Sequence, residues 1–277
     1  MDPWIATGVV LVPLVGAAAY VRTHRRGRDR MYARLEAARA GVVHQAPIEV
    51  DVGGTARDPA CLASAFAAER LLRVDEFVSP ATLTCLRDEA LRGIPRMDPS
   101  SIPLHKKGHT LSYEQVLRLA PHAVSFYYSR SVQRWLSIVT GTNARPTPLQ
   151  DQSSLSVLCY KDAGDHIGWH YDHNFYRGRH FTVLLALVNR SAGGGLSQGR
   201  LERQLPDGTA QAIHMPEGAL VVFEGNRVRH RATPIVEGDL RVILSMTYCD
   251  DPRISRVKEV ARRVKDTAFF GIRALWD

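Results

Sequence analysis

Two histidines and one aspartate in this sequence have the spacing of metal ligands. His170 and Asp172 lie one residue apart in the run from Gly168 to His173, and His230 follows much later in the chain. Residues i and i+2 of a β-strand point to the same face, so His170 and Asp172 can share one ion. Two imidazoles and one carboxylate occupy one face of an Fe(II) ion and leave the opposite face open for a bidentate co-substrate and O2.

A basic residue follows the second histidine within an apolar run. Arg241 begins the sequence Arg-Val-Ile-Leu-Ser-Met-Thr-Tyr, which ends at Tyr248. A charge inside such a run needs a partner, because burying it alone is costly. A His-x-Asp pair is common by chance, but the same pair followed by a distant histidine and then a basic residue is a much more specific pattern.

Short apolar runs separated by turns surround these residues. Pro206-Asp-Gly208 and Pro216-Glu-Gly218 are typical turn sequences. Length and residue type predict strands over residues 181–188, 201–205, 211–215, 219–223 and 241–248. Strands of this length and spacing are typical of a β-sandwich or jelly roll. The predicted fold class is therefore mainly β with flanking helices (α+β).

The order of these features resembles the 2-oxoglutarate/Fe(II)-dependent dioxygenases, and specifically their prolyl 4-hydroxylase-like branch. The resemblance covers about residues 70–250. It includes an opening phenylalanine and Ser-Pro over residues 74–83. The remaining matched positions are Tyr160, His170, Asp172, the strand 181–188, Gly194-Gly195, residues 218–223, His230 and Arg241.

The resemblance implies a double-stranded β-helix core and a role for each matched residue. His170, Asp172 and His230 would ligate Fe(2+), with no catalytic residue beyond these ligands. Arg241 would pair with the C5 carboxylate of 2-oxoglutarate, which its guanidinium fork suits.

Two further residues have expected roles at the co-substrate. Tyr160 would donate a hydrogen bond to 2-oxoglutarate, with a buried core tyrosine as the alternative. Ser245 lies four residues after Arg241 on the same strand face and could hold the same carboxylate.

The expected reaction is hydroxylation of a C–H bond with O2, releasing succinate and CO2, with ascorbate as a possible reductant. The substrate is left open between a peptidyl proline, a small metabolite and a lipid. Asp172 is retained where a small non-ligating residue would open a site for halide, so halogenation is disfavoured. The competing hypothesis is a non-catalytic metal-binding jelly-roll module held at a membrane.

Three neighbouring residues are given less weight. His166 could form a zinc pair with His170, but a surface or structural histidine is the expected reading. His173 could support the metal ligands or belong to a loop. Trp169 is expected to pack in the core.

The N-terminus predicts a single-pass membrane anchor. Residues 3–21 carry no charged side chain, and as a helix they would reach roughly 28 Å at ~1.5 Å per residue. Arginines at 22, 25, 26, 28 and 30 follow, which favours a cytoplasmic catalytic domain. The alternative, a signal peptide cleaved after residues 17–19, would need a positive leading region that is absent.

Composition supports this location. The net charge of +8 fits an anionic membrane surface. No nucleic-acid partner is expected, since nothing resembles a nucleic-acid-binding module. The four cysteines have no short spacing, which fits a reducing compartment.

Four segments are expected along the chain. Residues 1–28 form the anchor and basic flank, 29–60 a short helix and linker, 61–250 the dioxygenase domain and 251–277 an amphipathic helix. Residues 95–108 are expected to form a long loop, either a lid or a surface connection, and 110–141 to be mostly helical. The apolar face of the last helix should pack on its own domain, with a membrane as the alternative. That face comprises Ile254, Val257, Ala261, Val264 and Ala268.

Overall fold

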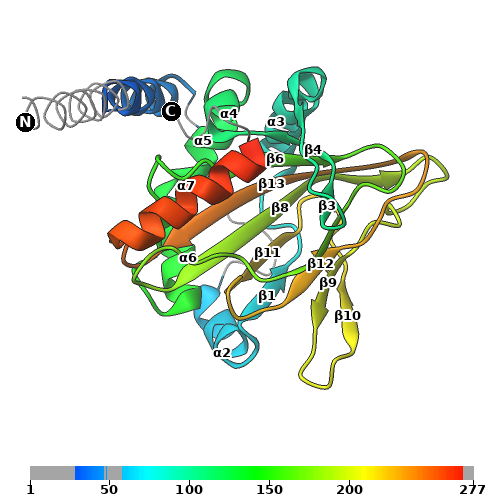
Figure 1. Cartoon of the computed structure of the whole chain (residues 1–277). Helices are drawn as coiled ribbons and strands as arrows, with labels where there is room; N and C mark the ends of the chain where they lie inside the picture. The colour runs from blue at the N-terminus through cyan, green and yellow to red at the C-terminus, as the bar shows by residue number, and fades with distance from the viewer. Residues whose placement is uncertain (1–28, 47, 49–57, 271–277) are drawn as a thin grey trace, which may run out of the picture.

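Two β-sheets face each other and form the centre of the molecule (Figure 1). The computed structural model describes residues 29–46, 48 and 58–270. The larger sheet has the order β1-β11-β8-β13-β6-β4-β2, with β5 paired to β13, and the smaller has the order β10-β9-β12-β7-β3. The larger sheet contains β1 (Leu71–Val74), β2 (Asp98–Pro99), β4 (His109–Leu111), β5 (Arg145–Pro146), β6 (Leu155–Tyr160), β8 (His180–Ser191), β11 (Leu220–Phe223) and β13 (Asp239–Cys249). The smaller contains β3 (Lys106–Lys107), β7 (His166–His170), β9 (Leu201–Gln204), β10 (Ala210–Ile213) and β12 (His230–Ala232).

The central strand β13 separates a hydrophobic core from the space between the sheets. It pairs antiparallel with both β6 and β8. Because side chains alternate along a strand, Val242 and Leu244 point into the main core, whereas Arg241, Ile243 and Ser245 face the pocket between the sheets. Each of the five strands predicted from the sequence overlaps an observed strand, which confirms a mainly β fold with helices.

Helices pack against the outer face of the larger sheet and complete that core. They are α2 (Pro59–Glu69), α3 (Pro80–Gly93), α4 (Tyr113–Leu119), α5 (Pro121–Tyr127) and α6 (Arg130–Thr140). The Ser79 hydroxyl caps α3 by accepting a hydrogen bond from the Thr82 amide at 3.2 Å. Residues 110–141 are mostly helical, as predicted, although the first of them belong to β4.

The segment 95–108, expected to be a long loop, contributes to the edges of both sheets. It includes the end of the 3-10 helix η2 (Ile94–Arg96), then β2, which pairs with β4, and β3, which pairs with β7. Lys106 on β3 is opposite Ile167 and is buried. The segment is therefore part of the wall of the pocket. It is neither a lid nor a surface connection.

The C-terminal helix α7 (Arg256–Phe270) packs with the face opposite to the one predicted. Val257, Val260 and Val264 are 80%, 62% and 61% exposed, whereas Arg262 is 3% exposed. Arg262 donates to the carbonyl of Gln150 and pairs with Glu259. The prediction that the apolar face packs on the domain is wrong, because polar side chains anchor the inner face and leave the valines outward.

The N-terminal part of the described chain is helical over residues 29–45, past Gly41, where the helix was expected to end. The domain boundary expected after residue 60 falls within α2. The expected membrane segment, residues 3–21, lies outside the described residues. Among the residues that are described, no helix is long and apolar enough to cross a membrane.

Candidate active site

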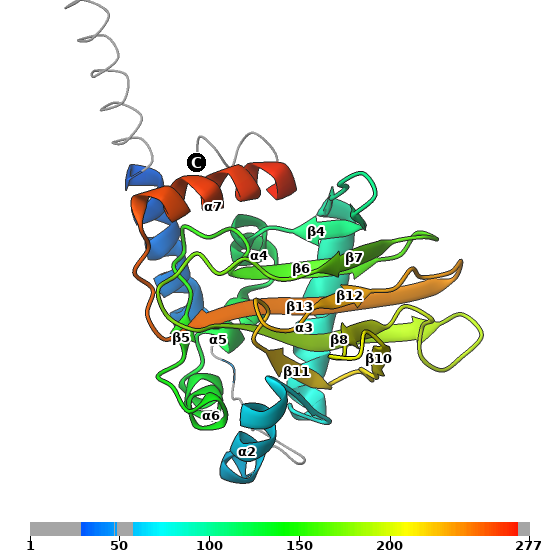
Figure 2. The same ribbon diagram turned by 60° about the horizontal axis from the view of Figure 1, so that its bottom comes forward.

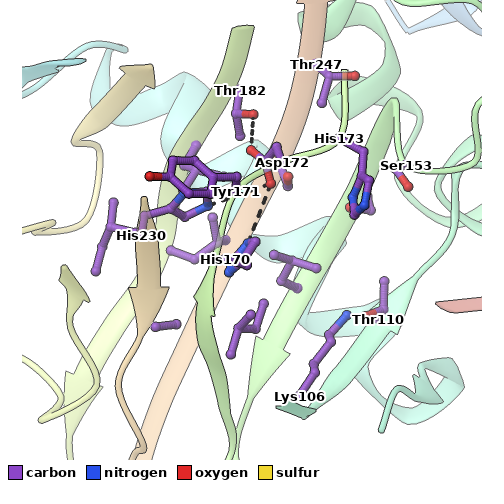
Figure 3. Close-up of a pocket in the computed structure, with 18 of the residues that line it drawn as sticks. Lys106, Thr110, Ser153, His170, Tyr171, Asp172, His173, Thr182, His230 and Thr247 are labelled. Carbon is purple, nitrogen blue, oxygen red and sulfur yellow. Dashed lines mark hydrogen bonds and ion pairs between the residues drawn. The ribbon is translucent and has the colours of Figure 1, made fainter. Parts of the chain in front are cut away.

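The structure brings His170, Asp172 and His230 together at one end of the pocket between the sheets (Figure 3). His170 ends β7 and lies opposite His230, the first residue of β12. Asp172 lies two residues after the end of β7. Its Oδ1 atom is 3.5 Å from Nε2 of His170 and 3.7 Å from Nε2 of His230. One ligand atom from each residue lies within 4.8 Å of the others, so the three can hold a single ion.

Hydrogen bonds to the backbone orient both imidazoles toward that point. Nδ1 of His170 is 2.8 Å from the carbonyl oxygen of Gly168, and Nδ1 of His230 is 2.9 Å from that of Val228. A carbonyl oxygen only accepts, so Nδ1 of each ring carries the proton. In the neutral ring, Nε2 then has a free lone pair facing Asp172, which is the form that binds a metal.

The carboxylate of Asp172 is held in a matching orientation. The Thr182 hydroxyl donates to Oδ2 at 2.5 Å, which leaves Oδ1 facing the histidines. Burial raises the pKa of Asp172, but His230, His170 and the Thr182 hydroxyl outweigh burial and hold this pKa well below its usual range. Burial lowers the pKa of His230. The side chains are thus an ionised carboxylate and a neutral imidazole, as metal ligation requires.

Gly225 makes room for this carboxylate. A Cβ atom at residue 225 would lie 2.1 Å from Oδ2 of Asp172, and the Gly225 carbonyl accepts the Asp172 amide at 2.9 Å. Sequence reasoning missed both Gly225 and Thr182. Their only signals were a glycine after the strand 219–223 and a threonine near the start of the strand 181–188.

The other end of the pocket holds a buried cation. The pocket has a volume of about 290 Å³, and both the three ligands and Arg241 line it. Arg241 is 3% exposed, its Nε atom has no hydrogen-bond partner, and its Nη2 atom contacts Sδ of Met215 at 3.7 Å. Among the described residues no carboxylate forms an ion pair with it. A buried guanidinium in this state is suited to an incoming anion.

Tyr160 lies beside Arg241, and both residues line the pocket. The two residues are paired across β6 and β13, and the guanidinium carbon is 5.4 Å from the ring centre. Burial raises the pKa of Tyr160 to about 12. Its hydroxyl therefore keeps its proton and can donate a hydrogen bond to an anion held by Arg241.

Ser245 also lines the pocket, but at a different level. It pairs with Ser156 and Leu184, and the next outward pair along these strands is Thr247 with Thr182, close to Asp172. At about 3.3 Å per residue, Ser245 lies about 13 Å along the strand from Arg241. This spacing places Ser245 toward the metal ligands and disfavours a shared contact with one carboxylate.

The three residues near the ligands that were given less weight differ in their position relative to the pocket. His166 bonds through Nδ1 to the Gly164 carbonyl and belongs to no candidate ligand group among the described residues. His173 lines the pocket and stacks on Phe175 at 5.7 Å. Trp169, expected in the core, instead lies between two guanidinium groups, at 4.5 Å from Arg231 and 5.7 Å from Arg229. On the strand, Trp169 alternates with His170, so it faces away from the pocket.

A second group of possible ligands comprises His109, Asp162 and Asp165. The Lys107 amine lies 3.6 Å from Asp165 and already supplies a positive charge. Backbone amides of residues 161 and 162 also bond to this carboxylate, so the group is accounted for as a structural turn.

Comparisons with known proteins agree with the fold. The model of the Halogenase D family matches residues 55–269. No curated protein matches. A prolyl-4-hydroxylase of Pseudomonas putida is similar at 15% identity and a TM-score of 0.54, over 70% of this chain and 99% of that one.

Two further solved structures are similar. A Trichoplax adhaerens prolyl hydroxylase, in complex with a hypoxia inducible factor fragment, has 18% identity and a TM-score of 0.56, over 70% of this chain and 90% of that one. The epimerase SnoN from nogalamycin biosynthesis, in complex with Fe3+ and alpha ketoglutarate, has 15% identity and a TM-score of 0.57, over 70% and 85%. The fold expected from the resemblance to 2-oxoglutarate/Fe(II) oxygenases is confirmed.

Proposed function

We propose that this chain, which belongs to the Halogenase D family, is an Fe(II)- and 2-oxoglutarate-dependent oxidoreductase that hydroxylates a C–H bond. One observation carries the proposal. Two histidines and one carboxylate that can hold a metal ion line the same pocket as Arg241, a buried arginine that forms no ion pair with a carboxylate of the described residues. When bound, iron and 2-oxoglutarate with O2 supply the oxidising power, with release of succinate and CO2.

The residues of this chain have defined tasks in that reaction. Nε2 of His170, Nε2 of His230 and Oδ1 of Asp172 would hold the iron, and Thr182 keeps Asp172 in place. Arg241 would pair with the C5 carboxylate of 2-oxoglutarate, and the Tyr160 hydroxyl would donate to it. Apolar side chains of the pocket wall keep water from the reacting carbon. These are Leu158, Ile167, Leu184, Leu201, Phe223 and Ile243.

Halogenation is the alternative that the family's name raises. A halide transferred from iron would need a coordination position of its own, and here Asp172 would take that position. Gly225 leaves room for the Asp172 carboxylate, and the Thr182 hydroxyl donates a hydrogen bond to it. Both features support Asp172 as a working metal ligand. Product mass analysis in a chloride buffer decides the question. Gain of one oxygen atom supports hydroxylation, whereas gain of chlorine contradicts it.

A non-catalytic metal-binding module is the second alternative. A scaffold has no use for an arginine buried without a carboxylate partner, so Arg241 favours an enzyme. The test is Fe(II)-dependent conversion of 2-oxoglutarate to succinate by the purified full-length chain under air. Iron binding without succinate formation, with or without candidate substrates, would contradict the proposed function.

We also propose that the chain is attached to a membrane through residues 3–21, with the catalytic domain on the cytoplasmic side. The apolar character of that segment and the arginines after it support this. The outward valines of α7 add support, because Arg253 and Arg256 beside them would complement an anionic lipid surface. In Figure 2, α7 lies along the side of the molecule at which the helix of residues 29–45 begins.

A further inference from the structure

A buried histidine on the wall of the candidate active-site pocket has an unsatisfied ring nitrogen. His180 is the first residue of β8, is 4% exposed and lines the pocket. Within the described part of the chain, its Nδ1 atom has no hydrogen-bond partner. A buried polar atom in this state costs free energy, and a ligand group that bonds to it removes that cost.

His180 lies on the far side of the metal ligands from Arg241. Thr182, two residues further along β8, points the same way from the strand and bonds to Asp172 (Figure 3). Arg241 is opposite Asn189, on the C-terminal side of Thr182 in β8, whereas His180 is on its N-terminal side, about 7 Å along the strand. Since 2-oxoglutarate would fill the stretch from Arg241 to the metal ligands, His180 faces the space that is left for the substrate.

A stacked tyrosine sets the plane of this imidazole. The ring centres of Tyr176 and His180 are 6.0 Å apart, and the ring planes differ by 24°. Tyr176 is itself held, because its hydroxyl donates to Oδ2 of Asp151 at 2.9 Å and its amide to Oδ1 of Asn174 at 2.9 Å. A half-turn of the histidine about its Cβ–Cγ bond keeps the plane of the ring and joins its two broad torsional minima. Either edge of the ring can therefore face the pocket while the stack is kept.

The charges around His180 favour an uncharged ligand group. The charged groups that act on it are Asp172, which would bind the metal, and Asp151 and Lys265, which lie 3.4 Å from each other. Burial lowers the pKa of His180, so the ring is neutral and donates through one nitrogen while it accepts through the other. A charged substrate group would lose its hydration here beside charges that are already paired, and an uncharged group avoids that cost.

We propose that His180 binds an uncharged hydrogen-bonding group of the substrate, an amide or an alcohol, on the side of the metal opposite Arg241. This inference rests on the proposed function and assigns its substrate class. His180 would hold the substrate with a C–H bond at the metal, and Tyr176 would keep the imidazole in the plane that this contact requires.

Binding to an enzyme that cannot turn over tests the substrate class. The full-length chain is loaded with 2-oxoglutarate and Zn(II), which has no redox chemistry, and calorimetry measures its affinity for small probes. The probes are primary amides and alcohols. Each is compared with the matching acid and amine, and with the analogue in which a methyl group replaces the polar group. We expect at least one amide or alcohol to bind about fivefold or more tightly than all three of its analogues.

Substitutions then locate the effect. His180→Phe keeps a ring that can stack on Tyr176 but removes both nitrogens. It should raise the Kd of that probe about fivefold or more and leave the Kd of 2-oxoglutarate within about twofold. His180→Gln keeps a donor and an acceptor, so it should restore part of the affinity. His44→Phe is the matched control, because His44 is exposed on the helix of residues 29–45.

Nuclear magnetic resonance gives a readout that a purely structural histidine would not change. In the Zn(II)-loaded chain labelled with ¹⁵N-histidine, the ring nitrogens of His180 are assigned by their loss in His180→Gln. These resonances should shift when the same amide or alcohol is added, because a hydrogen bond forms at the ring. Those of His44 should stay where they are. This measurement uses the wild-type chain and holds even if His180→Phe fails to fold.

The outcomes separate the class of ligand from the role of the residue. Tighter binding of the acids or amines, or no binding by any amide or alcohol, overturns the assigned class. An unchanged probe Kd in His180→Phe, or ring resonances of His180 that do not shift, overturns its role. Failure of the proposed function is distinct, because it appears as absent succinate formation by the Fe(II)-loaded wild-type chain whatever the probes bind.

Discussion

Arg241 and Tyr160 occupy the same level of the larger sheet, with the guanidinium carbon 5.4 Å from the centre of the phenol ring. Both side chains are buried, and the ring shields the charge from water. Tyr160 thus contacts the cation through its ring, while the Nε atom of Arg241 has no hydrogen-bond partner. This arrangement of a buried cation and a phenol is suited to binding one carboxylate beside Arg241.

Arg241→Ala should therefore weaken 2-oxoglutarate binding far more than iron binding. Loss of a buried charge-assisted pair costs about 2–5 kcal/mol, which is roughly 30-fold or more in KM. Arg241→Lys should retain part of the affinity, because it keeps the charge and loses the bidentate fork. Steady-state kinetics and Fe(II) titration measure the two effects. An unchanged KM in Arg241→Ala would assign the C5 carboxylate to another cation.

Gly225→Ala should impair iron binding although residue 225 is not a ligand. The added Cβ atom would lie 2.1 Å from Oδ2 of Asp172, so the carboxylate must move away from the histidines. We expect iron affinity to fall about 10-fold to 100-fold, as for other groups that orient metal ligands. Gly193→Ala is the control, because nothing lies within 4 Å of its added Cβ. Equal iron affinities in the two variants would refute this role.

Thr182→Val should act on the same carboxylate from the other side. It removes the hydroxyl that donates to Oδ2 at 2.5 Å while keeping the shape of the side chain. The expected loss of iron affinity is again about 10-fold or more. Thr182→Ser should restore most of it, because the hydroxyl returns. Fe(II) titration of the three proteins decides, and a Val variant as tight as the wild type would show that Asp172 needs no such support.

The sequence predicted four residues of the site, because residue type, spacing and the alternation of side chains along a strand can be seen in the sequence itself. They are His170, Asp172, His230 and Arg241. The five predicted strands were found for the same reason. Thr182 and Gly225 were not, since their roles depend on which residues the fold places against Asp172.

Other features depended on tertiary packing that sequence patterns do not encode. Lys106 looked like a loop residue, because a two-residue strand such as β3 carries almost no periodic signal. The apolar stripe of α7 predicted the wrong inner face, since long-range bonds from Arg262 and Lys265 decide how that helix packs. Trp169 likewise faces outward because its strand neighbour His170 faces the pocket.

The burial of Lys106 predicts a dependence of stability on pH. Burial lowers its pKa from 10.5 to about 8 in the folded chain. Between these values the unfolded state binds the proton more strongly, so the free energy of unfolding rises with pH across this window. Lys106→Met lacks this group, so the stability of the wild type relative to Lys106→Met should increase from pH 8 to pH 10.5. Urea denaturation without metal or 2-oxoglutarate measures it, and a constant difference would contradict a buried lysine.

The outward valines of α7 predict weak binding of the catalytic part to anionic lipid. Val257, Val260 and Val264 form one exposed stripe beside basic side chains, so a chain that begins at Asp29 should sediment with vesicles containing phosphatidylserine. Replacing all three valines with serine should weaken this binding on the order of tenfold, through lost apolar burial. Leu104→Ser is the control, since Leu104 is also exposed but lies on another segment.

The full-length chain should remain with membranes through carbonate extraction, with or without the three serines, because residues 3–21 would then supply the anchor. Loss of the full-length chain from membranes would contradict the anchor, whereas equal vesicle binding by the serine variant would contradict only the role of α7.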